Sequence, residues 1–515
     1  MKKITFLLVL VFCLTAADVY GKQISVNEAQ SLALNHMRRN HDPRLHGTEP
    51  ATQQLELVLE AKSNSLDVDY YVFNKGKCDG YIIVSGDDKA APILGFSDEG
   101  TFDINNIPDG LQYWLEVYSH EMQYLRSNPN APAASTRSKR PFSVRPLLTC
   151  NWGQVEPYNN MCPTYIEDGI TEHTLTGCVA TAGAQIMYYY RWPITGTGSH
   201  SYVCNVNYSG EQTLSADFGS TTYDWDNMLD SYDGSYTDTQ ANAVATLMSH
   251  VGISCDMFYG ATGSGSWIYR MMEALRNYFG YNKGMIDMRR GITPIDEWEQ
   301  TIMNELDNSR PVLYGGYKPN GSGHAFVVDG YNDEGYFHVN WGVGGRNNGY
   351  FLITALSLSD QESTYEGGFN TAQEIIIGIY PDDGTTTVPQ NYIELGCDDY
   401  KSSVSQVNLG ESAPILLNKF CVNGYGYYPT VVLRYGLNLT DLNNNTVDFK
   451  PGQLSDTDFW IGGCYSFAEH YTPPADLANG QYRLWLMYMV PEAGMTEYVP
   501  YDHSNTTTGY INATV

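Results

Sequence analysis

The first part of the chain changes from a helical to a strand-like pattern of apolar positions. Between residues 26 and 39 apolar side chains recur at helical spacing, and Ser25, with Glu28 three residues later, forms a possible capping box. Apolar runs bounded by Gly, Asp and Asn then predict strands at 55–61, 69–73, 81–84 and 92–96. A second helix is predicted at 111–125. The pattern therefore indicates a compact α+β unit.

A segment without large aliphatic or aromatic side chains follows this unit. Residues 127–140 read Ser-Asn-Pro-Asn-Ala-Pro-Ala-Ala-Ser-Thr-Arg-Ser-Lys-Arg. Such a segment has nothing to bury, so it is predicted to be an exposed linker. It is either a solvated spacer or a cleavable junction that releases an N-terminal pro-domain. The two interpretations are compatible, because proteases cut flexible loops.

The region from residue 146 to about 382 divides into a helical half and a strand half. Helices are predicted at 178–191, 238–253, 266–279 and 295–308. Apolar runs divided by Gly and Asn turns predict strands at 311–317, 324–331, 336–341 and 349–354. This order is typical of an α+β domain, and sites often lie between two such halves.

The last part of the chain shows no convincing long helix. Short apolar runs recur between turn residues at 391–395, 413–417, 429–436, 480–490 and 507–514. They predict an all-β domain, interpreted as an immunoglobulin-like sandwich. No group of charged residues there suggests chemistry, which leaves a surface or matrix ligand as the possible partner of this domain.

The chain opens with a secretory signal. Met-Lys-Lys precedes an apolar run from residue 4 to about 17, and small residues follow at Val19 and Gly21. The run is too short for a good membrane span. We find no second long apolar segment, so the mature protein is predicted to be exported and soluble, with no membrane span. Association with the cell surface stays open.

Charge and cysteine content narrow the functions further. The formal net charge is -29, from 58 acidic and 29 basic residues, which makes nucleic acid a poor partner. The cysteines are scattered and nine follow the signal, so a disulfide scaffold is not predicted. Pairs such as Cys150 with Cys162 or Cys421 with Cys464 stay open. No CxxC or HExxH occurs, and no metal site is predicted.

Cys178 has the local setting of a reactive thiol. It follows Gly177 and begins an Ala-rich helical run, and a helix N-terminus favours the thiolate. Thr176 is predicted to be the N-cap, and Gly177 lets a substrate approach the backbone. A buried cysteine acting as a small apolar residue is the alternative, and residues far downstream decide between the two.

A base and a group to orient it are available downstream. His324 begins a predicted strand 146 residues after Cys178, a separation found in papain-like enzymes. Asn340 lies on the next strand, where its amide oxygen could hold the imidazole tautomer. His338 competes with His324, but it is two residues from Asn340 on one strand, so the two project side by side. Asp329 could also orient a histidine.

Several separated motifs then resemble the streptopain family of secreted bacterial cysteine peptidases, in the order expected for that family. They are Trp152-Gly153-Gln154 with Pro157-Tyr158-Asn159, Thr176 to Ala182 with Ala184-Gln185-Ile186-Met187, Gly323-His324-Ala325, and Asn340-Trp341-Gly342. Residues 23–126, notably Ile82 to Asp88, resemble the family's pro-domain. The resemblance covers residues 23 to about 382.

This resemblance implies a role for each candidate residue. Cys178 would be the nucleophile, and His324 the general base and then acid. Gln154 and the Cys178 N–H would form the oxyanion hole. Asn340 would orient His324, and Trp341 would shield that pair from water. No cofactor is implied beyond reducing conditions. Val343 stands where the family usually has a second Trp, which affects specificity and removes no chemical group.

The resulting prediction is a secreted cysteine endopeptidase made as a zymogen, with protein and peptide substrates. Its parts are a signal (1–21), an inhibitory pro-domain and linker (22–140), a papain-like two-lobed catalytic domain (141–382) and a β-sandwich (383–515). The pro-domain should block the cleft or displace His324 until the chain is cut within 127–146. The alternatives are a catalytically decayed adhesion protein and a transglutaminase-like acyl transferase.

Overall fold

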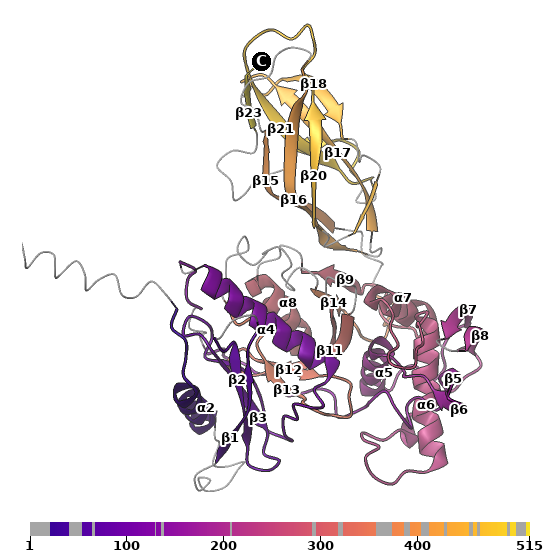
Figure 1. Cartoon of the computed structure of the whole chain (residues 1–515). Helices are drawn as coiled ribbons and strands as arrows, with labels where there is room; N and C mark the ends of the chain where they lie inside the picture. Colours follow the sequence, from indigo (N-terminus) through magenta and orange to yellow (C-terminus); the bar gives the residue numbers. More distant parts are fainter. Residues whose placement is uncertain are drawn as a thin grey trace, which may run out of the picture. The chain divides into compact units, whose positions relative to one another are not determined.

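The computed structural model contains helices and antiparallel sheets throughout (Figure 1). It describes residues 21–40, 54–63, 67–128, 130–134, 139–206, 209–290, 295–317, 323–356, 373–385, 392–402, 411–426, 430–452, 457–460, 464–491, 495–500 and 511–514. The predicted signal lies outside these residues. The chain divides into two compact units, Met1–Gly280 with Glu299–Glu362 and Tyr281–Trp298 with Ser363–Val515. The domain boundaries taken from the sequence stay predictions.

The described residues between 21 and 127 form two helices and four antiparallel strands. They are α2 (Val26–Asn40), β1 (Leu55–Ala61), β2 (Tyr70–Lys75), β3 (Tyr81–Ser85), β4 (Ile93–Ser97) and α4 (Asp109–Ser127). The predicted capping box is confirmed. The Glu28 N–H donates to Ser25 Oγ at 3.4 Å, and the Ser25 N–H donates to the Glu28 carboxylate at 2.8 Å. The predicted helices and strands of this segment are confirmed, with small shifts in their bounds.

The first unit also holds a mainly helical part with two short hairpins. Its elements are β5 (Thr164–Glu167), β6 (Ile170–His173), α5 (Cys178–Tyr190), β7 (Ser199–Val206), β8 (Gly210–Asp217), η1 (Trp225–Asn227), α6 (Asp238–Ser254) and α7 (Ile268–Tyr278). The sequence did not predict the hairpins, because their strands are largely exposed and carry few apolar residues. Helix α8 (Ile295–Asp307) follows, as predicted.

One continuous sheet joins the N-terminal segment to the strands that follow the helices. These strands are β10 (Val312–Tyr317), β11 (Gly323–Tyr331), β12 (Phe337–Asn340) and β13 (Gly349–Phe351). Within the first unit the order is β1-β2-β3-β4-β13-β12-β11-β10. The join is antiparallel, with Tyr350 opposite Phe96 and Phe351 opposite Gly95. Two segments about 250 residues apart in sequence therefore share one hydrogen-bonded ladder.

The two faces of this sheet are covered by different helices. Gly316 lies opposite His324, and Gly315 lies opposite Ala325. A Cβ on Gly316 would lie 2.4 Å from an aromatic carbon of α4, whereas a Cβ on Gly315 would lie 2.1 Å from Ile268. Directly opposite residues share a face and neighbours along a strand alternate. His324 therefore lies on the face covered by α4, called the α4 face. Ala325 lies on the opposite face, which packs against α5 and the start of α7 and is called the α5 face.

Helix α4 is held on its face by an aromatic cluster. Trp114 is 2% exposed, and its ring contacts the rings of Tyr314, Phe326 and Trp341 at 5.6, 5.6 and 6.1 Å. Its indole N–H donates to the Leu352 carbonyl at 2.9 Å. Edge-to-face aromatic contacts of this kind add to the stabilisation from burial. The N-terminal segment is thus fixed on the same strands that carry His324.

The second unit consists mostly of strands. They are β9 (Ile286–Arg289), β14 (Gln373–Ile377), β15 (Tyr392–Ser402), β16 (Ala413–Gly426), β17 (Thr430–Thr440), β18 (Thr446–Pro451), β19 (Thr457–Trp460), β20 (Cys464–Tyr471), β21 (Gln481–Met489), β22 (Val499–Pro500) and β23 (Ile511–Thr514). Cys421 lies opposite Cys464 across β16 and β20. From β15 onward this unit is all-β over its described residues, as predicted, while β18 to β20 and β22 were not predicted.

Substitution of Trp114 tests how firmly α4 is held. Trp114→Ala should lower the free energy of unfolding of the full chain by about 3–5 kcal/mol, because a large buried ring is removed from a packed cluster. Trp114→Phe keeps most of the ring contacts and loses the bond to Leu352, so its effect should be smaller. Urea denaturation of the two variants and the wild type measures both. Equal stability of Trp114→Ala and the wild type would contradict this packing.

Candidate active site

Cys178 is the first residue of α5, and the residue before it shapes this helix start. Gly177 is the N-cap, with φ at +88°. A Cβ at Gly177 would lie 2.7 Å from Met257 Sδ and 2.9 Å from the Ser264 carbonyl oxygen. Both the backbone conformation and the lack of space require glycine here.

The prediction that Thr176 caps α5 is wrong. Thr176 Oγ1 instead bonds Thr181 Oγ1 at 2.9 Å, and Thr181 Oγ1 donates to the Gly177 carbonyl at 3.0 Å. Glycine provides the turn into the helix, and no side chain caps its N-terminus. The first N–H groups of α5 are therefore not used by a capping side chain, which is the arrangement that an oxyanion or thiolate needs.

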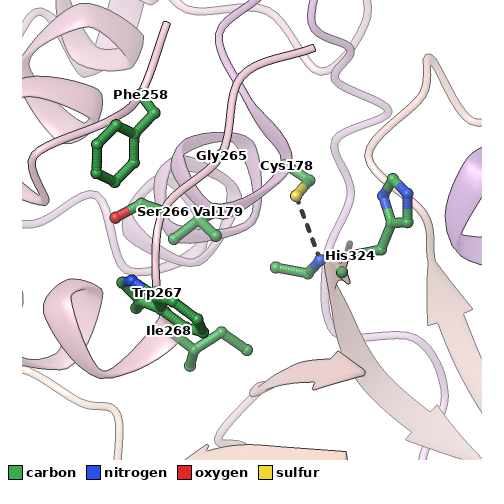
Figure 2. A pocket seen from close by; sticks show the side chains of 10 residues that line it. Cys178, Val179, Phe258, Gly265, Ser266, Trp267, Ile268 and His324 are labelled. Carbon is green, nitrogen blue, oxygen red and sulfur yellow. Dashed lines mark hydrogen bonds between the residues drawn. The ribbon is translucent and has the colours of Figure 1, made fainter. Parts of the chain in front are cut away.

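The Cys178 thiol is partly exposed and accepts a hydrogen bond from the adjacent strand. The Ala325 N–H of β11 donates to its sulfur at 3.4 Å (Figure 2). Burial raises the pKa of the Cys178 thiol above its ordinary value. The N–H groups of Ala325, Val179 and Cys178 itself act in the opposite direction, and the Asp109 carboxylate raises the pKa further. In this conformation the thiol is therefore neutral at pH 7.

A pocket with a volume of about 210 Å³ opens beside the sulfur. It is lined by Cys178, Val179, Phe258, Gly265, Ser266, Trp267, Ile268, Gly323, His324 and Ala325. Phe258 and Trp267 are exposed large apolar side chains, 63% and 39% exposed. Figure 2 shows both on the side of the pocket formed by the segment before α7, across from the start of β11, where His324 lies. The pocket is thus mainly apolar, with the thiol on one wall.

His324 is close to Cys178 in the fold, but its ring is turned away. Figure 2 shows the imidazole directed away from the sulfur. Its Nε2 lies 3.8 Å from the Asp109 carboxylate at the start of α4. This position agrees with the alternation along β11, which places His324 on the α4 face, whereas the Ala325 N–H contacts the thiol. The structure brings the two backbones together and keeps the two reactive side chains apart.

Gln154 lies beside the turn that precedes Cys178. Its carbonyl accepts a hydrogen bond from the Thr176 N–H at 3.2 Å, and its side chain is half-buried. The neighbouring Trp152 carbonyl accepts from the Gly344 N–H at 3.0 Å. The segment 152–154 therefore lies between the Cys178 turn and the loop after Trp341, close to both.

Asn340 is not brought to His324. Its Oδ1 accepts from Gln185 Nε2 at 3.1 Å and from the Gly342 N–H at 3.1 Å. Its Nδ2 donates to the Cys150 carbonyl at 2.9 Å. Asn340 lies opposite Val327, so its side chain is on the α5 face. The prediction that it orients His324 directly has no counterpart in these contacts, because the two residues occupy opposite faces of the sheet.

Trp341 shares the α4 face with His324. It is 3% exposed, its ring lies 4.9 Å from that of Phe326, and its indole N–H donates to the Asn347 carbonyl at 2.9 Å. A Cβ at Gly110 of α4 would lie 2.9 Å from the Trp341 ring. Helix α4 therefore covers the tryptophan closely, and glycine at position 110 makes this approach possible.

Asp329 forms its ion pair with His338. His338 Nδ1 lies 2.6 Å from Asp329 Oδ1, and Asp329 Oδ2 accepts from the Leu148 N–H at 2.9 Å. Asp329 is completely buried. His338 is therefore bonded to Asp329 within the sheet, and it does not line the pocket beside Cys178. It does not compete with His324 as the partner of Cys178.

Asp109 and the pocket aromatics were not predicted, and Gln185 belonged to a recognised motif but was given no role. Gln185 had a local signal, because it follows Cys178 by seven residues, two helical turns. Asp109 had none, since its place beside His324 depends on how α4 lies on the sheet. Cys78, Cys150, Cys162, Cys204 and Cys255 are free thiols, as is Cys178. Over the described residues, no cluster of three or more His, Cys, Asp or Glu could hold a metal ion.

Comparison with known proteins identifies the family. The Peptidase C10 family model matches residues 152–351, and the Spi protease inhibitor model matches residues 21–122. The streptopain of Streptococcus pyogenes serotype M1 is 35% identical over 324 residues, which are 60% of this chain and 80% of streptopain. The chain belongs to the peptidase C10 family. The resemblance noted from the sequence is confirmed, and the N-terminal segment is an inhibitor-like pro-domain.

Two further C10 relatives support this assignment. The solved structure of a prointerpain A fragment from Prevotella intermedia is 34% identical, with a TM-score of 0.55, over 64% of this chain and 99% of the fragment. Thiol protease/hemagglutinin PrtT of Porphyromonas gingivalis is 33% identical over 398 residues. These are 74% of this chain and 44% of PrtT, so the chain matches less than half of that relative.

The neutral thiol gives a testable pH dependence. In the full-length C10 chain, alkylation of Cys178 by iodoacetamide should be slow at pH 7 and rise only above pH ~8.5, since the folded pKa is raised and the thiolate forms only above it. The Cys178→Ala variant corrects for the other thiols, and peptide mass spectrometry measures labelling at Cys178. Fast labelling at pH 6 before any cleavage would contradict a neutral thiol.

Proposed function

We propose that this chain is a secreted cysteine endopeptidase made as a zymogen. The observation that carries the proposal is the thiol at the N-terminus of α5. It lies in an apolar pocket that His324 at the start of β11 also lines. The C10 match and the inhibitor-like pro-domain support it. We further propose a papain-like arrangement of two lobes around this pocket, and an immunoglobulin-like sandwich for the C-terminal strands.

The proposed reaction forms and breaks a thioester. In the matured enzyme His324 takes the proton of Cys178, and the sulfur attacks the scissile carbonyl. Gln154 Nε2 and the Cys178 N–H donate to the oxyanion, and the imidazolium then protonates the leaving amine. Water activated by His324 hydrolyses the thioester and restores the thiol. For this sequence the imidazole must turn from the α4 face towards the sulfur.

The pro-domain explains why the uncut chain should be inactive. Asp109 lies beside His324, and α4 covers the adjacent Trp341. We expect release of α4 to uncover Trp341 and to let the His324 ring turn towards the sulfur. Trp341 would then border the histidine and limit its access to water.

The cleavage that matures the enzyme is expected before Val144. Val144 and Tyr331 exchange two backbone hydrogen bonds of 2.9 Å, so residues from 144 onward belong with β11. Lys139 pairs with Asp333 at 2.9 Å and is largely exposed. A protease needs an accessible, extended segment, which favours cleavage among the residues before 144. Mass spectrometry of the secreted form identifies the new N-terminus.

The pocket favours peptides with an apolar side chain. Phe258, Trp267 and Ile268 offer an apolar surface beside the thiol, and the residues that line the pocket include no Asp, Glu, Lys or Arg. A large aliphatic or aromatic side chain near the scissile bond would bury its surface there. Protein and peptide substrates with such residues are therefore the proposed class.

Export and the other partners follow from the sequence as proposals. The signal at residues 1–21 would direct secretion, and none of the described helices is long and apolar enough to cross a membrane. A surface or matrix ligand for the C-terminal strands stays a proposal. An adhesion protein with a decayed site is not favoured, since the relatives are named thiol proteases or belong to the same family. An acyl transferase would reveal itself by cross-linked products.

Removal of the nucleophile is the direct test of this function. Cys178→Ala should abolish both casein hydrolysis and self-maturation, because no thioester can form. Cys78→Ala is the matched control, since Cys78 is an exposed free thiol in the pro-domain and should leave both unchanged. New amino termini are counted by mass spectrometry. Hydrolysis by purified Cys178→Ala at the wild-type rate would disprove the assignment.

Substitution of Gln154 tests the oxyanion hole. Gln154→Ala should lower kcat about 10²–10³-fold with little change in KM, because the lost donor acts mainly on the transition state. Gln300→Ala is the control, since Gln300 lies on the exposed side of α8, where its side chain bonds Asn304. Steady-state kinetics on a fluorogenic peptide measures the difference. A rise in KM alone would assign Gln154 to substrate binding instead.

A further inference from the structure

We propose that Gln185 is a positioning residue. It holds α5, which carries Cys178, in place against the segment that carries Gln154 and against the end of β12, which Trp341 follows. This inference rests on the proposed function and adds a residue to it. Gln185 is completely buried on α5, and its side chain bonds Asn340. Among the described residues its side-chain hydrogen bond is to Asn340, and its effect on Cys178 is therefore exerted through that residue.

The orientation of both amides follows from the backbone. The Gly342 N–H can only donate, so the Asn340 atom that it meets is the oxygen. The Cys150 carbonyl can only accept, so the Asn340 atom on that side is the nitrogen. Gln185 meets the same Asn340 oxygen, and it must therefore present its own N–H₂ group. Two fixed backbone groups thus determine how the two side chains pair.

This orientation leaves the Gln185 oxygen buried without a partner. Gln185 Oε1 has no hydrogen bond among the described residues, and its position follows from the donation by Nε2. A buried acceptor without a partner destabilises the fold, and an apolar side chain of the same shape would avoid that cost. Glutamine at such a position therefore points to a role other than stability.

The three bonds of Asn340 connect the three parts of the proposed site. Gln185 lies two turns after Cys178, about 10.5 Å along the same helix. Cys150 leads into the segment that carries Gln154, and Gly342 follows Trp341 directly. An amide with three hydrogen bonds at this junction fixes relative positions more strictly than apolar packing does. A shift of α5 against the oxyanion segment would misalign the sulfur and the oxyanion donor.

The test separates activity from stability with two variants. Gln185→Met keeps the shape and removes both the donor and the unpaired acceptor. We expect its thermal unfolding midpoint to equal or exceed that of the wild type, while kcat falls at least tenfold and KM stays within twofold. Ile186→Val, a buried neighbour on α5, is the control and should lower the midpoint with kcat unchanged. The pro-domain is removed from all variants by added trypsin.

Gln185→Glu adds a pH signature. A carboxylate cannot donate to the Asn340 oxygen, whereas a protonated carboxyl can. The kcat of this variant relative to the wild type should therefore rise as the pH falls. A Gln185 that merely filled space would give a pH-independent ratio. Unchanged kcat in Gln185→Met, or a loss of kcat that parallels a loss of stability, would overturn the inference.

Alkylation of Cys178 distinguishes this inference from the proposed function. At pH 5 the matured wild type should react rapidly with iodoacetamide through its thiolate, and Gln185→Met should react at least tenfold more slowly. This readout needs no peptide hydrolysis. A wild type that is alkylated but hydrolyses no peptide would contradict the endopeptidase proposal alone. Equal alkylation rates in the two proteins would contradict the role of Gln185 alone.

Discussion

The alternation of side chains along β11 is the constraint on which the proposed latency depends. Adjacent residues of a strand face opposite sides, so the backbone of Ala325 can touch the thiol while the ring of His324 faces α4. The pro-domain uses this property by extending the same sheet and laying α4 on one face. The histidine is then held on the covered side, and the thiol on the other side stays neutral.

The sequence was sufficient to predict most of the helices and strands and a reactive cysteine. Helix periodicity and the Ser25 capping box predicted α2, and a thiol after glycine at a helix start predicted Cys178. It was not sufficient for contacts between distant segments. The positions of Asp109 beside His324 and of Trp114 on Trp341 depend on a helix crossing the sheet, which leaves no local pattern. The exposed hairpins lacked apolar runs and were missed.

Asn340 shows why a motif does not by itself assign a role. Its order along the chain suggested that it orients His324, and strand register places it on the α5 face with Gln185 and Cys150. Side chains alternate between the two faces along each strand, and this alternation together with the register decides which side chains meet. A sequence motif does not show the register. Trp341, one residue later, lies on the α4 face together with His324.

The ladder between β4 and β13 has a consequence for the protein after cleavage. In the proposed maturation the pro-domain leaves, and β13 would become an open edge whose N–H and C=O groups could recruit a strand from another molecule. Its brevity counters this hazard, because three residues offer few bonds to an invading strand. A short junction is thus easy to leave during maturation and is also a poor template for aggregation.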